Sequence, residues 1–375
     1  MKTLHSIQNM RGIASLLVVL FHFRYTLNGP YVQKDLGNLL FSNGAFGVDL
    51  FFIISGFIIV YATEKDSSPQ SFIIKRMLRI YPVILFVMLM SLTFVDRIHF
   101  DANFIKSLFF VPNNFNREAP TFGYVTIYSA WTLTYEVLFY ATFLIGMNIS
   151  HKYRAEVTSI IILLAFIGLR FTYGEGITLE GSSTLTSQGV MPLFKLLSSP
   201  MMLEFILGMI IYVSIRKLDK FIKMYSKELK PFSTASLMLS VSFFFICFSS
   251  GYLHGHGLSG FGLYAAILFV SYLLHELVHG HEKIKFLSFI GDISYSLYIG
   301  HIFVLDILWQ YRNDLGIYYL TSGFSRLAVL MVASFIFSMA IFFLIEKPLI
   351  KLARKYSGRV TPPLKNSFSG SNLNS

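Results

Sequence analysis

The sequence contains few charged residues and almost no cysteine, and each shortage excludes a class of structure. Only 14% of the 375 residues are Asp, Glu, Lys or Arg, whereas a soluble domain carries about 25%. The single cysteine, Cys247, excludes a disulfide bond within the chain. The sequence also lacks an internal repeat and any polar segment long enough for a separate soluble domain. An ordinary soluble enzyme is therefore excluded.

The apolar residues that remain are grouped in long runs, which is typical of a membrane protein. The hydrophobic fraction is 54% and the mean hydropathy is +0.60. Mainly apolar runs of about 17 residues or more, enough to cross a bilayer, recur along the chain. We therefore predict an all-α, polytopic membrane protein with about ten transmembrane helices. The predicted spans are 11–27, 44–62, 80–96, 127–148, 157–173, 196–215, 233–249, 261–277, 287–310 and 325–345.

These spans predict one membrane-embedded domain followed by a short tail. The first span is not a cleaved signal peptide, because His22 and Arg24 lie in its second half and no small-residue cleavage site follows. Residues 1–350 are predicted to form the transmembrane domain. Residues 351–375 are predicted to form a cytoplasmic tail that is first basic and then disordered.

The distribution of Lys and Arg predicts the orientation. If both termini are cytoplasmic, 22 of the 31 Lys and Arg residues lie on the cytoplasmic side, as the positive-inside rule requires. The net charge of +11 then describes a membrane face next to anionic lipid. Because the basic residues are dispersed over five loops and a tail, we expect membrane lipid and no nucleic acid as a partner.

The first span carries two ionisable residues on one face. Arg11 and His22 are eleven residues apart, about three helical turns, so both side chains lie on one side of the helix about 16 Å apart. Ionisable residues inside a membrane span are costly and mark candidate functional sites. A cation near the surface and a proton-transfer group near mid-bilayer suit a ligand that enters end-on.

Three further ionisable residues are predicted at a depth similar to that of His22. They are Asp49, Glu136 and His301, each on a different span. Four such residues at similar depth predict one buried polar cavity. Ser55-Gly56, six and seven residues beyond Asp49, would let another helix approach closely.

A basic segment before the third span contains Arg76 and Arg79, followed by Tyr81. The two arginines share a helix face because they are three residues apart, and paired guanidinium groups bind phosphate well. The alternative is that they are ordinary positive-inside anchors.

His275-Glu276-Leu277-Val278-His279 matches the H-E-x-x-H pattern of zinc proteases. It lies at the end of a predicted span, near the membrane surface, where polar residues cost little free energy. No third zinc ligand is evident beyond Asp292. We therefore expect no metal site, and zinc proteolysis is the weakest alternative.

Taken in order, these motifs resemble the membrane acyltransferase-3 family, which includes O-acetyltransferases of bacterial surface polysaccharides. Each motif is short, but the ordered set covers residues 11 to 348. The matching segments are Arg11-Gly-Ile-Ala with His22, Gly47-Val-Asp49-Leu-Phe-Phe with Ser55-Gly-Phe, Arg76-x-x-Arg79-Ile-Tyr81-Pro, Trp131-x-Leu-x-x-Glu136, Ser294-Tyr-Ser-Leu-Tyr298 with His301, and Glu346-Lys-Pro.

The resemblance implies a stand-alone, ten-helix O-acetyltransferase of the bacterial inner membrane. The acetyl donor would be cytoplasmic acetyl-CoA, and the acceptor a sugar hydroxyl of a surface polysaccharide or lipid-linked glycan. Arg11, Arg76, Arg79 and Tyr81 would bind the coenzyme. The catalytic residues would be His22, as base or as acylated nucleophile, with Glu136, Asp49 and His301.

A proton-coupled transporter is the alternative from another functional class. A mid-membrane cavity containing His and carboxylates also suits a carrier. The absence of inverted repeats and the ordered motifs favour the acyltransferase.

Overall fold

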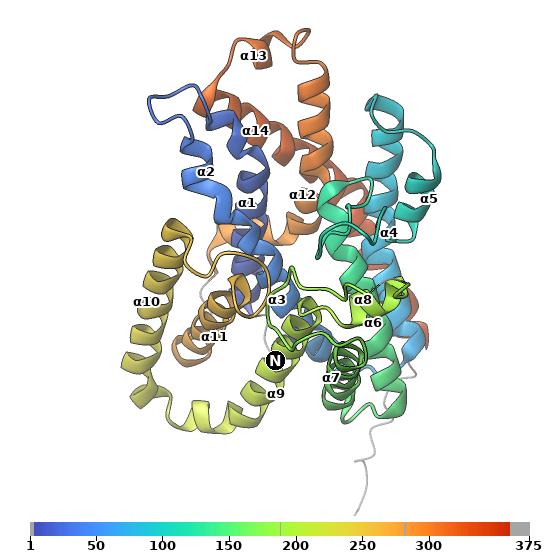
Figure 1. Ribbon diagram of the computed structural model, residues 1–375. Helices are drawn as coiled ribbons and strands as arrows, with labels where there is room; N and C mark the ends of the chain where they lie inside the picture. The colour runs from blue at the N-terminus through green and yellow to red at the C-terminus, as the bar shows by residue number, and fades with distance from the viewer. Residues whose placement is uncertain (1–3, 188, 281–282, 361–375) are drawn as a thin grey trace, which may run out of the picture.

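The computed structural model describes residues 4–187, 189–280 and 283–360, and within these ranges the secondary structure is entirely helical (Figure 1). Short 3₁₀ turns join several of the helices. The α-helices are α1 (His5–Phe23), α2 (Leu36–Phe41), α3 (Phe46–Ala62), α4 (Pro69–Phe94), α5 (Ala102–Leu108), α6 (Trp131–Ile149), α7 (Arg154–Thr172), α8 (Pro192–Leu197), α9 (Met201–Met224), α10 (Ser226–Ser250), α11 (Phe261–His279), α12 (Lys285–Gln310), α13 (Gly316–Tyr319), α14 (Gly323–Ile341) and α15 (Lys347–Val360).

The prediction of an all-α, polytopic membrane protein is confirmed. Within the described ranges, nine helical segments are long and apolar enough to cross a membrane, one fewer than predicted. The exception is the predicted span 196–215, which corresponds to α9. This helix has 24 residues, but its second half is too rich in charge to count as an apolar span. The charged residues there are Arg216, Lys217, Asp219, Lys220 and Lys223.

Two helices begin well before the apolar runs that predicted them. The helix α1 begins at His5 and α4 at Pro69, where 11 and 80 were expected. The side chain of Ser68 caps α4 by accepting a hydrogen bond from the amide of Ser71, and proline is favoured at the first helical position. Arg76 and Arg79 therefore lie in the second and third turns of α4 rather than ahead of it.

The loop before α4 is anchored by Asp66. Burial alone would raise the pKa of this carboxyl, but hydrogen bonds from Lys75, Ser71 and Ser68 lower the pKa below its ordinary value. The Nζ atom of Lys75 lies 2.6 Å from Asp66. The ion pair links this loop to the second turn of α4.

The helices α1 and α12 pack unusually closely. A Cβ atom on Gly12 would lie 2.5 Å from the carbonyl oxygen of Leu287, and one on Gly291 would lie 2.0 Å from that of Gln8. Only glycine allows this approach. As a result, the polar residues of the two helices face each other along their length.

The helices α3 and α9 make the same kind of contact, as Ser55-Gly56 predicted. A Cβ atom on Gly56 would lie 2.1 Å from the Phe205 carbonyl oxygen, and one on Gly208 would lie 2.0 Å from that of Ile53. The predicted close approach of a second helix at Gly56 is confirmed.

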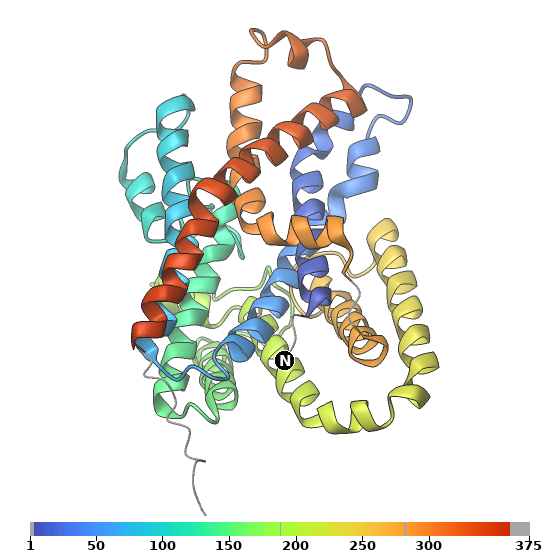
Figure 2. The same ribbon diagram turned by 180° about the vertical axis from the view of Figure 1, so that it is seen from behind.

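The last two helices cross the back of the molecule as one long diagonal (Figure 2). A π-helical turn, Phe342–Glu346, joins α14 to α15. It places Glu346 in the interior, where its Oε2 atom accepts a hydrogen bond from Ser296 at 2.5 Å. The predicted boundary between residues 350 and 351 falls inside α15, and residues 361–375 of the predicted tail lie outside the described residues.

Candidate active site

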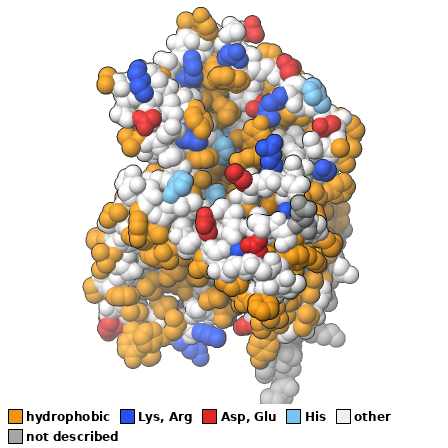
Figure 3. Space-filling model, viewed as in Figure 1, with side chains coloured by type: hydrophobic (Ala, Val, Ile, Leu, Met, Phe, Trp, Pro, Cys, Tyr) orange, Lys and Arg blue, Asp and Glu red, His pale blue; other side chains and the backbone are white. Residues whose placement is uncertain are grey.

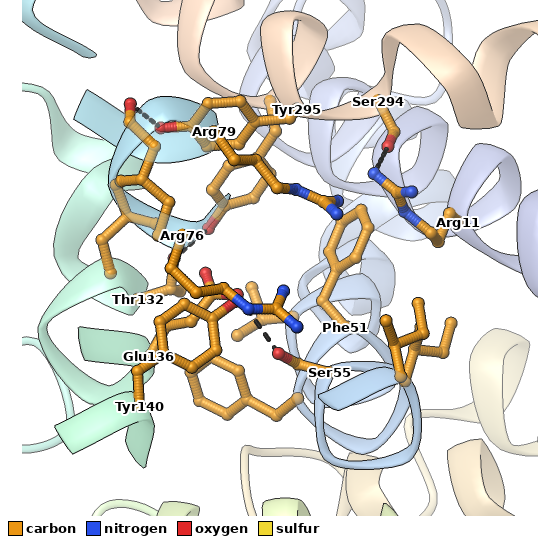
Figure 4. A pocket seen from close by; sticks show the side chains of 17 residues that line it. Arg11, Phe51, Ser55, Arg76, Arg79, Thr132, Glu136, Tyr140, Ser294 and Tyr295 are labelled. Carbon is orange, nitrogen blue, oxygen red and sulfur yellow. Dashed lines mark hydrogen bonds between the residues drawn. The ribbon is translucent and has the colours of Figure 1, made fainter. Parts of the chain in front are cut away.

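Five helices enclose a cavity that contains three arginines (Figure 4). The helices are α1, α3, α4, α6 and α12. The guanidinium groups of Arg76 and Arg79 reach from α4 toward α3, and Arg11 faces them from α1 (Figure 4). The lining residues are Arg11, Val48, Phe51, Phe52, Ile54, Ser55, Ile58, Arg76, Arg79, Ile80, Thr132, Leu133, Glu136, Tyr140, Ser294, Tyr295 and Tyr298.

Arg11 is held in the cavity by neighbours on α1 and α12. It donates to the Oγ atom of Ser294 at 2.8 Å and to the Oε1 atom of Gln8 at 3.1 Å. Gln8 in turn donates to Asp292 at 2.6 Å. Both acceptors are neutral oxygens, so within the described residues no carboxylate is hydrogen-bonded directly to this guanidinium.

Arg76 and Arg79 are placed by aromatic and acidic neighbours. Arg76 stacks on Tyr140, with 4.9 Å between the guanidinium carbon and the ring centroid. The buried carboxylate of Glu346 interacts electrostatically with both Arg79 and Arg11. Arginine suits this arrangement better than lysine, because its planar group stacks and still presents a fork of donors.

Glu136 also belongs to the arginine cavity. Its Oε1 atom accepts hydrogen bonds from Ser55, at 3.2 Å, and from the hydroxyl of Tyr140. Within the described residues it makes no hydrogen bond to His22. The carboxylate therefore balances the charge of the arginines and does not orient the histidine.

His22 and His301 contact each other beyond the arginine cavity. The Nδ1 atom of His22 lies 3.2 Å from the Nε2 atom of His301 and 2.8 Å from the carbonyl oxygen of Val18. The Nδ1 atom of His301 lies 3.0 Å from the carbonyl oxygen of Leu297. A carbonyl only accepts hydrogen bonds, so both Nδ1 atoms carry the proton in the neutral rings.

This tautomer leaves a lone pair on the Nε2 atom of His22, as a base or a nucleophile requires. The Nδ1–H group of His22 is shared between Val18 and the lone pair of His301. If His22 gains a proton or an acyl group at Nε2, His301 can accept a stronger hydrogen bond and spread the positive charge. Among the described residues, no carboxylate bonds to either ring.

One face of α12 connects the arginine cavity to the histidine pair. Ser294 bonds to Arg11, Tyr298 lines the cavity, and His301 contacts His22. The hydroxyl of Tyr298 lies 3.0 Å from Thr132 and donates to the Ser129 carbonyl at 2.8 Å, which fixes the ring between the two sites. His301 follows Ser294 by seven positions along the helix, a rise of about 10 Å.

Asp49 lies at a third site, separate from the arginine cavity and from the pair of His22 and His301. Its Oδ2 atom is 2.7 Å from the Nδ1 atom of His256, and its Oδ1 atom accepts a hydrogen bond from the amide of Gly257 at 2.8 Å. No hydrogen bond joins it to His22 within the described ranges. The four residues expected in one cavity are therefore divided among three sites, and only His22 and His301 touch.

Tyr81 is placed away from the arginines. Its ring packs against Phe110, with 5.1 Å between centroids, and it is not among the residues lining the cavity. Six polar cavity residues were not predicted as site residues, namely Ser55, Thr132, Tyr140, Ser294, Tyr295 and Tyr298. The available signal was their spacing on the same helices, relative to Asp49 for Ser55 and to Glu136 or His301 for the other five.

The H-E-x-x-H segment has a structural role. Glu276 accepts hydrogen bonds from the backbone amides of His5, at 2.7 Å, and Ser6, at 2.8 Å, and so caps the start of α1. His279 lies 3.1 Å from Thr234. Within the described residues, no group of three His, Cys, Asp or Glu side chains is placed to hold a metal ion.

Comparison with known proteins agrees with this architecture. The chain is 27% identical over 343 residues to the exopolysaccharide production protein ExoZ of Rhizobium meliloti (strain 1021), covering 86% of this chain and 94% of that protein. No solved structure matches the chain. The acyltransferase domain profile of the acyltransferase-3 family matches residues 4–343. The chain therefore belongs to the acyltransferase-3 family of membrane proteins.

Proposed function

We propose that this protein transfers an acetyl group from acetyl-CoA to a sugar hydroxyl of a cell-surface polysaccharide or lipid-linked glycan. The observation that carries the proposal is the cavity in which Arg11, Arg76 and Arg79 converge. Coenzyme A carries several phosphate charges, and arginine forks bind phosphate with directional hydrogen bonds. ExoZ, to which the chain is similar, is named for exopolysaccharide production.

The donor would enter from the cytoplasm with its phosphates at the arginines. The narrow acyl-bearing arm would run along α12, past Tyr298, toward the histidine pair. The face of α12 that carries Ser294, Tyr298 and His301 supports this path. The thioester would then lie beside the Nε2 atom of His22.

His22 would act at this point by one of two routes. As a general base, its Nε2 atom would remove the proton of the sugar hydroxyl while the hydroxyl oxygen attacks the thioester carbon and the coenzyme A thiolate leaves. As a nucleophile, the same atom would take the acetyl group first and pass it to the hydroxyl. In both routes His301 would stabilise the cation that forms on His22.

The function is tested in cells. Surface polysaccharide is purified from the parent strain, from a strain lacking the gene, and from that strain complemented with wild-type or His22→Ala protein. We expect O-acetyl proton signals in the NMR spectrum of the parent and wild-type-complemented samples only. Full acetylation without the gene would refute the proposal.

The proposed orientation, with both termini cytoplasmic in a bacterial inner membrane, counts α9 as the tenth crossing and has its own test. Single cysteines are placed in 113–117 or in 222–228, with Cys247 replaced by alanine. An impermeant thiol reagent should label the first position in intact spheroplasts and the second only after lysis. The opposite pattern would place the arginine cavity on the wrong side for cytoplasmic acetyl-CoA.

A further inference from the structure

The loop between α10 and α11 contains two histidines, His254 and His256, each followed by glycine. We propose that His256, oriented by Asp49, forms a binding site for a hydroxyl group of the sugar acceptor. The site is distinct from the arginine cavity and from the histidine pair. The proposal rests on the proposed function, because it names the residues that receive the acceptor of that reaction.

The hydrogen bonds of Asp49 fix the imidazole of His256. The carboxylate accepts from Nδ1 at 2.7 Å through one oxygen and from the Gly257 amide at 2.8 Å through the other. The proton therefore lies on Nδ1, and Nε2 presents a lone pair. Within the described residues Nε2 has no hydrogen-bond partner. Asp49 is completely buried, but the His256 side chain is 19% exposed, so a ligand can reach it.

A second carboxylate lies behind this pair. Glu204 is completely buried and interacts directly with Asp49. Neither of its oxygens accepts a hydrogen bond of ordinary geometry from a described residue. Two adjacent buried carboxyl groups cannot both be ionised at low cost, and without a bonded Lys or Arg they destabilise a fold. Packing alone therefore does not explain why Asp49 and Glu204 are buried beside His256. A need to hold the imidazole firmly toward a ligand would explain it.

The loop that carries His256 is held rigidly. The carbonyl oxygen of His256 accepts a hydrogen bond from the amide of Gly181 at 2.7 Å. Gly257 has a φ of +102°, and a Cβ atom there would lie 2.4 Å from the carbonyl oxygen of Leu179. The loop is thus fixed to the segment between α7 and α8 before any ligand arrives, which lowers the entropy cost of binding.

The surroundings suit a carbohydrate. Ser182, next to Gly181, begins one wall of a polar cavity between two loops, and Lys195 closes it by donating to the Phe115 carbonyl at 3.0 Å. Hydroxyl, amide and charged groups of this kind hydrogen-bond sugar hydroxyls. The cavity's other polar lining residues are Asn116, Arg117, Glu118, Thr184 and Thr186.

The His256 site lies next to the arginine cavity, but His256 does not line that cavity. The ring of His256 contacts the edge of Trp131 at 5.5 Å between centroids, and the next residue, Thr132, bonds to Tyr298 in the arginine cavity. The first turn of α6 thus separates the two sites. On the face shown in Figure 3, histidine side chains lie around a hollow near the middle.

His254 provides a matched control. Its Nδ1 atom lies 2.6 Å from the side-chain oxygen of Asn43, so it is tethered in the same way as His256, two residues away, but to a neutral group. It is more exposed than His256. If substitution acts by disturbing the loop, changes at His254 and at His256 should impair acceptor binding equally. If His256 contacts the acceptor directly, only its substitution should do so.

Two substitutions of His256 separate binding from loop anchoring. In His256→Asn the amide nitrogen takes the place of Nδ1 and keeps the bond to Asp49, but Nε2 is lost. In His256→Gln the terminal group reaches the position of Nε2, but the bond to Asp49 is lost. The acceptor probe is de-O-acetylated polysaccharide from the strain lacking the gene, and KM is measured for it and for acetyl-CoA.

We expect His256→Asn to raise the KM for the polysaccharide about tenfold or more, with the KM for acetyl-CoA within about twofold of wild type. His256→Gln should be less affected, and His254→Asn unaffected. Asp49→Asn, which loosens the imidazole, should raise the KM for the polysaccharide and leave that for acetyl-CoA unchanged. An anchoring role predicts the reverse order, with His256→Gln impaired and His256→Asn normal, and that result would overturn the proposal.

Direct binding separates failure of this inference from failure of the proposed function. Binding of the same polysaccharide to purified protein in nanodiscs is measured without acetyl-CoA. Wild-type protein should bind it, and His256→Asn should bind at least about tenfold more weakly. If wild-type protein binds but transfers no acetyl group, the proposed function fails and the acceptor site stands. Equal binding by wild type and His256→Asn would refute the acceptor site even if transfer is observed.

Discussion

The protein holds two imidazoles, those of His22 and His256, in opposite ways. His22 contacts a carbonyl oxygen and a second imidazole, whereas His256 contacts a buried carboxylate. Both rings carry the proton on Nδ1 and present Nε2, so the difference lies in what stabilises a positive charge. Asp49 supplies a fixed counter-charge to His256, and His301 supplies only a polarisable neighbour to His22.

The positions of the two rings suit two different tasks. A carboxylate partner orients an imidazole, as in a Ser-His-Asp triad, and does not by itself decide whether that imidazole takes part in the reaction. His22 lies at the end of the α12 face that leads from the arginine cavity, whereas His256 lies on the other side of the first turn of α6. We therefore assign the chemistry to His22 and the orientation of the acceptor to His256. The predictions below test this division.

Loss of His22 should have the largest effect. Because a positioned base contributes about 10²- to 10⁴-fold to rate, His22→Ala should lower kcat by at least about a hundredfold. His301→Ala should cost only about tenfold, since it removes one hydrogen bond to the charged form of His22. Both are measured as labelled acetyl transfer by purified protein, with abundance and gel-filtration profile as controls. A larger loss in His301→Ala than in His22→Ala would reverse their assigned roles.

Loss of an arginine should have an intermediate effect, and that effect should be mainly on the KM for acetyl-CoA, the acetyl donor. Arg76→Ala or Arg79→Ala should raise the KM for acetyl-CoA about tenfold or more with a smaller change in kcat, because a ground-state contact with phosphate is lost. Lysine at either position should restore only part of the affinity, since it cannot form a bidentate contact.

Lys75 is the control for the arginines. It lies on the same turn of α4 but bonds to Asp66 and does not line the cavity. Lys75→Gln should leave the KM for acetyl-CoA within about twofold of wild type. If the KM for acetyl-CoA rises equally in Arg76→Ala, Arg79→Ala and Lys75→Gln, the arginines act only as a diffuse positive charge at the membrane surface.

Loss of the Glu276 carboxylate should have the smallest effect on activity. Glu276→Gln weakens a helix cap worth about 1 kcal/mol, so the melting temperature in detergent should fall by a few degrees while transfer stays within about twofold of wild type. A zinc enzyme would instead lose all activity in this variant and in chelator. Stoichiometric zinc in the active purified protein would contradict the capping role.

The membrane fold could be predicted from sequence because hydropathy and helix periodicity are local properties. Arg11 and His22 are placed on one helix face by spacing alone, and Gly56 indicated a close helix contact that the structure contains. The start of α4 could also have been predicted, since Ser68-Pro69 is a capping signal. It was missed because a hydropathy window responds to apolar residues and not to caps.

The arrangement of the site could not be predicted in the same way. Helix depth gave similar levels for Asp49, Glu136 and His301, but depth does not determine the direction in which a side chain points. The partner of Asp49 comes from a loop whose conformation depends on contacts with another loop, so no local pattern indicates His256. The charged second half of α9 likewise keeps this helix out of the candidate apolar spans, a feature that a hydropathy average does not register.

Transfer of labelled acetyl from acetyl-CoA by the purified protein tests the central claim most directly. Protein in nanodiscs is mixed with acetyl-labelled acetyl-CoA and de-O-acetylated polysaccharide, and the polysaccharide is recovered and treated with mild base. We predict that wild-type protein places base-labile label on the polysaccharide and that His22→Ala places almost none while still binding acetyl-CoA. Unlabelled polysaccharide with wild-type protein that binds both ligands, or full labelling by His22→Ala, would contradict the account.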